Sequence, residues 1–121
     1  MTGRRANPET LLQRSVLDLL ARHPAVAWAK RINTGSGMLM HRDKKTGALA
    51  HSRFLRFGFK GCADIIGQMK DGRFLAVECK LPGEDPTEDQ QAFLDVVRAA
   101  HGVAFVARDP VDVVRELNPR R

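Results

Sequence analysis

The stretch GCADIIGQMKDGRFLAVECK, residues 61–80, decides the fold, because two short apolar runs flank a tight turn within it. Three charged residues, Asp64, Glu78 and Lys80, interrupt these runs. Strands tolerate such residues poorly, so their presence calls for a reason. A carboxylate on each of two paired strands, with a lysine two residues after the second carboxylate, would make a small site for a metal ion and a phosphate.

The turn decides whether the two carboxylates share a face of the hairpin. A two-residue turn at 71–72 would point Asp64 and Glu78 to opposite faces, because side chains alternate along a strand. A three-residue loop at 70–72, with Gly72 in the left-handed conformation of a bulge, shifts the register by one residue. Asp64 then lies directly opposite Glu78. The functional interpretation therefore predicts the three-residue loop.

The rest of the chain supplies helices and further strands around this hairpin. We expect helices at residues 7–23, 87–101 and 110–117, and strands at residues 25–33 and 103–107. Trp28 is the one large anchor of the first of these strands. The order is helix, strand, basic insert, hairpin, helix, strand and short helix. This order predicts an α/β domain with a mixed central β-sheet flanked by helices.

An insert over about residues 34–60 separates the first strand from the hairpin. We expect a flexible break at 34–37 and a loop or loose hairpin at 38–52, because glycine and polar residues are frequent there. Residues 53–59 then mix aromatic and basic side chains, which is compatible with nucleic-acid contact. We interpret Phe57 and Phe59 as core residues.

Positive charge is concentrated in and beside this insert. Eight Lys or Arg and one acidic residue occur from Lys30 to Lys60, a charge of +7 in a chain whose net charge is +6. Such concentration is typical of a protein that binds a polyanion, and a solvated basic loop is the alternative. The predicted DNA-binding residues are Lys30, Arg31, Arg42, Lys44, Lys45, Arg53, Arg56 and Lys60.

The composition fits a single domain over residues 1–121, since 43% of the 121 residues are hydrophobic. No apolar run could cross a membrane, and the N-terminus lacks the apolar segment of a signal peptide. We therefore expect a cytoplasmic protein with no membrane partner. We expect Cys62 and Cys79 to be reduced. A zinc site is not expected, because no His or Cys lies near them at ligand spacing.

Two residues outside the hairpin are further candidates for the site. Glu9 lies three residues before Leu12, on or beside the buried stripe of the first helix, and its alternative role is to complement the helix dipole. Gln90 lies three residues before Phe93 and shares the buried face of the second long helix. Gln90 also forms the pattern of a capping box with Thr87, which would explain it without a catalytic role.

The hairpin residues have the chemistry of phosphodiester hydrolysis. Two adjacent carboxylates repel each other, so they need a cation or a shared proton. Mg²⁺ prefers carboxylate oxygens and keeps waters that a phosphate can replace. The backbone carbonyl of Cys79 could join Asp64 and Glu78 as a ligand. The metal would polarise a phosphate and lower the pKa of a bound water, while Lys80 would act on that water or on the charge at phosphorus.

Four motifs, in this order, resemble the VRR-NUC domain, the virus-type replication-repair nuclease branch of the PD-(D/E)XK superfamily. They are GCAD at 61–64, GRFLAVECK at 72–80, TEDQQAF at 87–93 and GVAFVA at 102–107. The resemblance spans nearly the whole chain. It implies a restriction-endonuclease-like fold and DNA cleavage that depends on Mg²⁺, with Mn²⁺ as a substitute.

The resemblance also assigns roles to residues of this sequence. Asp64 and Glu78 match the metal carboxylates of the family, and Lys80 matches its catalytic lysine. Gln90 matches the glutamine of the helix after the lysine. Glu9 matches the acidic residue of the first helix and is a further candidate metal ligand. Small stand-alone members resemble homodimers that cleave branched DNA such as Holliday junctions, so the resemblance implies a structure-selective endonuclease that acts as a homodimer.

Two other interpretations compete with the endonuclease. The first is a nucleic-acid-binding module on the same fold that does not cleave, which the intact set of Asp64, Glu78 and Lys80 disfavours. The second is a small basic structural protein in which an ion pair between Lys80 and a carboxylate holds the hairpin. That interpretation leaves the clustering of the motifs unexplained.

Overall fold

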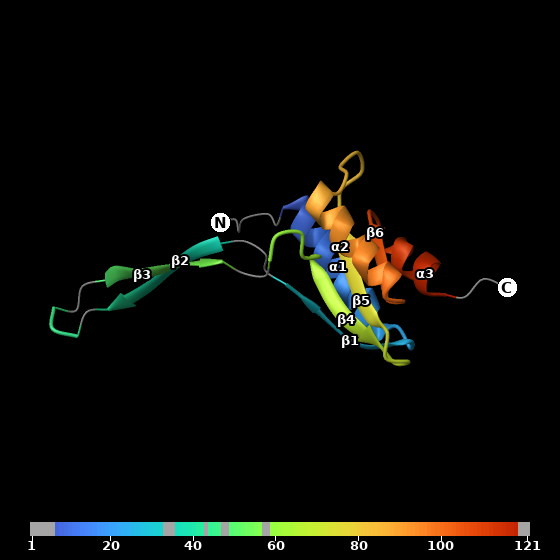
Figure 1. Ribbon diagram of the computed structural model, residues 1–121, viewed down its shortest axis with the longest axis horizontal. Coiled ribbons are helices and arrows are strands. Elements are labelled where there is room, and N and C mark those ends of the chain that lie inside the picture. The colour runs from blue at the N-terminus through green and yellow to red at the C-terminus, as the bar shows by residue number, and fades with distance from the viewer. Residues whose placement is uncertain (1–6, 33–35, 43, 47–48, 57–58, 119–121) are drawn as a thin grey trace, which may run out of the picture.

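The computed structural model describes residues 7–32, 36–42, 44–46, 49–56 and 59–118. Its elements are α1 (Pro8–Arg22), β1 (Val26–Arg31), β2 (Ser36–Arg42), β3 (Leu49–Arg56), β4 (Ile65–Met69), β5 (Phe74–Cys79), α2 (Glu88–Ala99), β6 (Val103–Ala107) and α3 (Val111–Leu117). Four strands form a sheet in the order β1-β4-β5-β6, and β2 pairs with β3 in a separate sheet (Figure 1). The pairs β1–β4 and β4–β5 are antiparallel, and β5–β6 is parallel. The predicted α/β domain with a mixed sheet flanked by helices is confirmed.

Helix α1 begins and packs as its sequence predicts. Asn7 caps it, because its side-chain oxygen accepts a hydrogen bond from the Thr10 N–H at 2.9 Å, and Pro8 occupies the first helical position. The side chains that it buries recur every fourth residue, at Leu12, Val16 and Leu20. One face of α1 therefore packs along its whole length.

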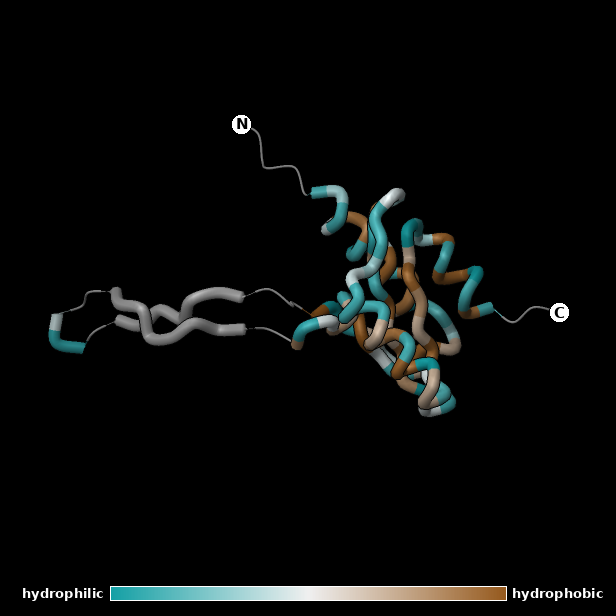
Figure 2. Tube along the Cα trace, turned by 45° about the horizontal axis from the view of Figure 1, so that its top comes forward, coloured by the Kyte–Doolittle hydropathy of each residue, from teal (hydrophilic) through white to brown (hydrophobic). Residues whose placement is uncertain are grey.

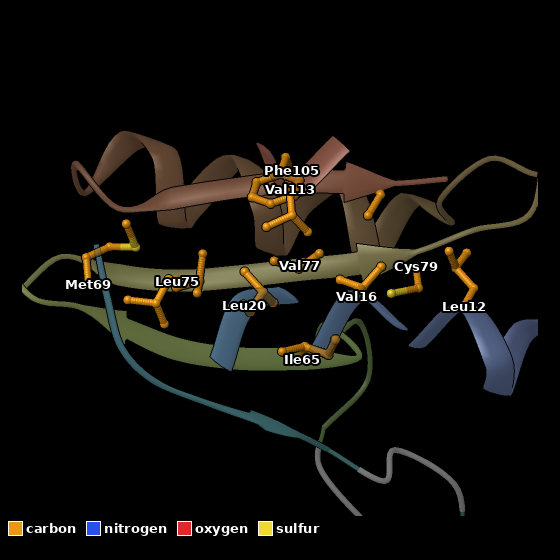
Figure 3. Packing of buried hydrophobic residues seen from close by; sticks show 12 residues of the cluster. Leu12, Val16, Leu20, Ile65, Met69, Leu75, Val77, Cys79, Phe105 and Val113 are labelled. Atoms are coloured by element: carbon orange, nitrogen blue, oxygen red, sulfur yellow. The ribbon is translucent and has the colours of Figure 1, made fainter. Parts of the chain in front are cut away.

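Helices pack on both faces of the sheet. Side chains alternate along β5, so that Leu75, Val77 and Cys79 pack with α1 and α3 in the larger core cluster (Figure 3). Figure 3 shows Leu12 beside Cys79 and Leu20 nearer Leu75, so the start of α1 lies at the Cys79 end of β5. On the other face, the second cluster joins α2 to the sheet through Ala63, Ala76, Leu94, Val97 and Ala104. The domain is thus a three-layer α/β/α arrangement, with its hydrophobic residues between the layers (Figure 2).

The insert contains an antiparallel ribbon of β2 and β3 that extends away from the four-stranded sheet (Figure 1). Of the two alternatives for residues 38–52, the hairpin is therefore the one that forms. The predicted break at 34–37 is wrong for Ser36 and Gly37, because both belong to β2 and pair with Arg56 and Leu55. Thr34 and Gly35 lie outside the described residues.

Two aromatic residues are not the core residues that the sequence predicts. Phe59 is 53% exposed and only meets the ring of Phe93 edge to face, at 5.1 Å between centroids. Trp28 is 42% exposed, because α2 packs on β5 and β6 and leaves that side of β1 without a helix. Phe57 lies outside the described residues. Both cysteines are free and buried. Among the described residues, no helix is long and apolar enough to cross a membrane.

Candidate functional site

The turn between β4 and β5 is the three-residue loop that the functional interpretation predicts. Gly72 has φ +98°, in the left-handed region, and its N–H donates to the Met69 carbonyl at 2.9 Å. The Met69 N–H donates to the Arg73 carbonyl at 2.8 Å, so these two residues close the loop. Asp71 supports the turn through a 3.1 Å hydrogen bond from the Arg73 N–H to its side chain. The loop therefore consists of residues 70–72.

This loop sets the register that brings the two carboxylates together. Ile65 pairs with Val77, and the next positions along both strands are Asp64 and Glu78. Glu78 shares the face of β5 that carries Ala76 and that α2 partly covers. Asp64 lies just before β4, and a hydrogen bond between the two carboxyl groups brings it to Glu78. The predicted loop and its register are therefore confirmed, and the two carboxyl groups lie together.

The ladder between β4 and β5 ends at this point, and Asp64 replaces its next hydrogen bond. Hydrogen-bonded pairs alternate in an antiparallel ladder, and Met69–Arg73 is one, so Ala63 and Cys79 would be another in an extended ladder. Instead, the Cys79 N–H donates to Asp64 Oδ2 at 2.8 Å. The Cys79 carbonyl projects from the same edge of β5, beside the Asp64 carboxylate. Its predicted role as an oxygen ligand fits this backbone geometry.

Glu78 is the buried charged residue of the site. Its side chain is 1% exposed, and its Oε2 atom is buried without a hydrogen-bond partner. Such an unpaired buried oxygen is costly and rare, so it requires an explanation such as an ion or a water. A cation bound to this oxygen would supply the missing partner.

Burial and neighbouring charges raise the pKa of Glu78 to about 9. Burial is the largest cause, followed by a hydrogen bond with Asp64 that favours the protonated acid and by repulsion from the Asp64 carboxylate. Lys80 acts in the opposite direction, and Glu9 adds to the repulsion. Without a cation, the Asp64–Glu78 pair therefore holds a proton at neutral pH.

Lys80 is half-buried at the end of β5, and its charge acts on Glu78. Among the described residues, however, Lys80 forms no ion pair with Asp64 or Glu78. The hairpin is therefore not held by the salt bridge that the structural interpretation invoked.

Glu9 comes to the site from the other end of the sequence. It is half-buried in the first turn of α1, and its charge raises the pKa of both Glu78 and Cys79. The first turn of α2 lies at the same end, because a Cβ at Gly61 would be 2.5 Å from the Asp89 carbonyl oxygen. The positive ends of two helix dipoles thus face the end of the sheet that carries the carboxylates.

Gln90 forms the capping box that its sequence pattern predicts. Its side-chain oxygen accepts from the Thr87 N–H at 2.9 Å, and the Thr87 hydroxyl accepts from the Gln90 N–H at 3.2 Å. This role accounts for Gln90 in the structure. A role in catalysis stays a prediction.

The predicted DNA-binding residues lie on β1, on the β2–β3 ribbon and, for Lys60, beside the start of α2. Lys30 and Arg31 are exposed on β1, and Lys44 and Lys45 are exposed at the tip of the ribbon. Arg42 belongs to β2, while Arg53 and Arg56 belong to β3. Lys60 forms an ion pair with Asp89 at 3.2 Å, and both side chains are exposed. This exposed pair contributes little to stability.

The donor set fits a hard divalent cation better than zinc. The described part of the chain has no group of three or more His, Cys, Asp or Glu side chains arranged to hold a metal ion. It does have two adjacent carboxylates, one of them with an unpaired oxygen, and a backbone carbonyl. Mg²⁺ is commonly bound by one or two carboxylates and completes its shell with waters and substrate oxygens.

Cys62 is a further neighbour of the site, as its position in the predicted hairpin indicates. The thiol of Cys62 is buried, and the negative charges of Glu78 and Asp64 help to raise its pKa. Burial is the largest cause of this rise. The only sequence signal was its position two residues before Asp64.

No protein-family model matches this chain, and no curated protein matches it significantly. The VRR-NUC resemblance therefore rests on the four motifs alone.

Proposed function

We propose that this protein is a metal-dependent DNA endonuclease that hydrolyses phosphodiester bonds. The observation that carries the proposal is the buried Oε2 of Glu78, without a partner, opposite Asp64 and two residues before Lys80. This geometry supplies ligands for a cation and a free ammonium at one end of a sheet. If no cation bound there, the buried Glu78 carboxylate beside Asp64 would only destabilise the fold.

Each residue has a separate task in this proposal. Asp64 and Glu78 hold Mg²⁺ with the Cys79 carbonyl, and Glu9 adds negative charge that favours a cation. Mn²⁺ is a substitute for Mg²⁺, since it also suits carboxylate and carbonyl ligands. When bound, the ion polarises the phosphate and acidifies a water. Lys80 orients that water or stabilises the charge that develops on the phosphate oxygens.

The fold supports the same proposal. The order of the elements agrees with the restriction-endonuclease-like core that the motif resemblance implies, with the ribbon as an insertion after β1. We propose on this basis that the chain is a VRR-NUC nuclease. Its preferred DNA is branched, like a Holliday junction, and it acts as a homodimer in the cytoplasm.

Incubation with a four-way junction, a linear duplex and single strands, in Mg²⁺, Mn²⁺ or EDTA, tests the proposal. We expect cleavage of the junction in either metal and none in EDTA. Binding without cleavage in all conditions would instead identify the non-cleaving module. If the protein neither binds nor cleaves DNA, the result would favour the structural-protein interpretation. Gel filtration with light scattering tests the dimer separately.

A further inference from the structure

An open part of the sheet adjoins the carboxylates, on the face that α2 only partly covers. Helix α2 packs mainly on β5 and β6, so none of the helices that the structure describes packs extensively on the β1–β4 half of this face. Side chains on this face form rows across the strands, because paired residues lie side by side. The first row contains Trp28, Gln68 and Phe74, and the second contains Lys30, Ile66 and Ala76. Glu78 is the next residue of β5 on this face, and Asp64 meets it there.

The outer row presents two aromatic rings. Trp28 is 42% exposed and Phe74 is 41% exposed, although large aromatic side chains are usually better covered. The indole N–H of Trp28 donates to the side-chain oxygen of Gln68 at 3.1 Å. This bond fixes the edge of the indole and leaves part of its ring exposed. Exposed aromatic rings on one face of a sheet are the kind of surface on which bases stack.

The second row carries a cation between the rings and the carboxylates. Lys30 is exposed and, within the part of the chain that the structure describes, has no acidic partner. Successive rows lie roughly 7 Å apart, because alternate residues of a strand share a face. Trp28 is therefore about 14 Å along the sheet from the level of Asp64. A nucleic-acid strand could reach from the carboxylates to the rings within a few nucleotides.

We infer that this open face binds an unpaired DNA strand that leaves the active site, with its bases stacked on Trp28 and Phe74 and a phosphate on Lys30. The inference rests on the proposed function for the identity of the partner and specifies which part of the DNA the site recognises. Bases in an intact duplex stack on each other and cannot stack on these rings. A branched or frayed substrate provides the unpaired nucleotides that this face requires.

A second copy of the chain is the other occupant that such a face could have. The open rows adjoin the end of the sheet where Glu78 is buried beside the half-buried Asp64. A protein partner on β1 and β4 would therefore cover the approach to the carboxylates. The exposed cation Lys30 at the centre also favours a polyanion over an apolar protein surface.

Trp28 is the only tryptophan of the chain, so its fluorescence reports directly on this face. The protein is titrated in EDTA, which prevents cleavage, with oligothymidylate, a blunt duplex and the same duplex with a single-stranded tail. We expect saturable quenching by oligothymidylate and by the tailed duplex but not by the blunt duplex. Anisotropy of a labelled DNA measures binding independently of the tryptophan.

Variants separate stacking from general attraction. Trp28→Ala should weaken binding of the tailed duplex about tenfold, the effect of one lost stacking contact, whereas Trp28→Phe should retain most of it. Lys30→Gln should weaken it more than Arg22→Gln, which removes an equal charge from α1 on the opposite face of the sheet. Val114→Ala, at an exposed apolar position on α3, should have no effect. Thermal unfolding confirms that each variant folds.

Three results would overturn the inference. One is DNA binding that leaves the Trp28 fluorescence unchanged, and another is equal affinity of Trp28→Ala and wild type for the tailed duplex. Fluorescence that changes with protein concentration and not with DNA would assign the face to a second copy and overturn it as well. Quenching without cleavage in any metal would refute the nuclease and support the open face as a DNA site. Cleavage without quenching would support the nuclease and refute the open face as a DNA site.

Discussion

The Cys79 N–H donates a hydrogen bond to Asp64 Oδ2, at 2.8 Å, where the ladder between β4 and β5 ends. This contact orients the Asp64 carboxylate beside Glu78, so that the acids lie together before any cation arrives. The register of the hairpin and this single hydrogen bond thus create the candidate metal site. The fold accepts an unpaired buried oxygen on Glu78 as a result.

Mg²⁺ should raise the melting temperature of the wild-type chain. The ion would occupy the unpaired oxygen of Glu78 and offset the repulsion from Asp64, and a ligand at a hundredfold excess over its Kd stabilises by about 2.7 kcal/mol. Differential scanning fluorimetry should show a rise of roughly 10 °C for a domain of this size. Glu78→Gln should lose the rise, while Asp71→Asn, at an exposed acid of the turn, should keep it. Equal shifts in both variants would argue against a metal at Glu78.

The stability of the metal-free protein should fall as the pH rises. The pKa of Glu78 is about 9 in the folded chain and about 4.5 when unfolded, so the folded state binds more protons between these values. The contribution of Glu78 is therefore complete below pH 4.5 and lost as the pH approaches 9. Urea unfolding in EDTA should show wild type losing up to about 1.4 kcal/mol per pH unit relative to Glu78→Gln. A pH-independent difference would refute the protonated pair.

Much of the site could be predicted because its signals are local. The position of Gly72 in the turn fixes the register, and the register decides which side chains share a face. The capping patterns at Asn7 and Thr87 likewise gave the starts of both long helices. Each of these features depends on residues a few positions apart. The pairing of β2 with β3 has no such local signal, so the sequence left a loop and a hairpin as alternatives for this segment.

The exposure of the residues that were predicted wrongly depends on contacts between distant parts of the chain, which no local sequence pattern indicates. Trp28 has the alternation of a strand residue, but its exposure depends on which strands α2 covers. Phe59 has the sequence signal of a core residue but is exposed, with its ring against Phe93 of α2. The charge of Glu9 reaches Glu78 only because α1 packs along the sheet with its start at the Cys79 end. The motif resemblance suggested that Glu9 lies near Glu78, whereas the helical periodicity alone did not.

Two glycines with positive φ should respond differently to alanine. Gly72 has φ +98° with open space around its Cβ position, so Gly72→Ala should cost about 1 kcal/mol from the backbone alone. Gly61 has φ +87°, and its Cβ would also meet the Asp89 backbone at 2.5 Å. Gly61→Ala should therefore cost roughly 1–3 kcal/mol more. Chemical denaturation measures both, and equal losses would show that the contact between Gly61 and α2 is unimportant.

Gln90 can be tested for a role beyond its cap. Glu also completes a capping box, so Gln90→Glu should keep the stability of α2, whereas Gln90→Ala should lose about 1 kcal/mol. If Gln90 serves only as a cap, Gln90→Glu should also cleave DNA at the wild-type rate. A stable Gln90→Glu protein with a much lower rate would place Gln90 in the active site. Thermal unfolding and cleavage assays on the same samples decide between these outcomes.

The cleavage rate of a branched DNA under single-turnover conditions tests the nuclease most directly. Asp64→Asn keeps an oxygen for the Cys79 N–H and removes the charge, while Lys80→Ala removes the ammonium and leaves the ligands. Lys70→Ala, at an exposed lysine of the turn, is the matched control. We predict metal-dependent cleavage by wild type and Lys70→Ala, and losses of at least about 100-fold in Asp64→Asn and Lys80→Ala. Cleavage in EDTA, or wild-type rates in Asp64→Asn and Lys80→Ala, would contradict the proposed site.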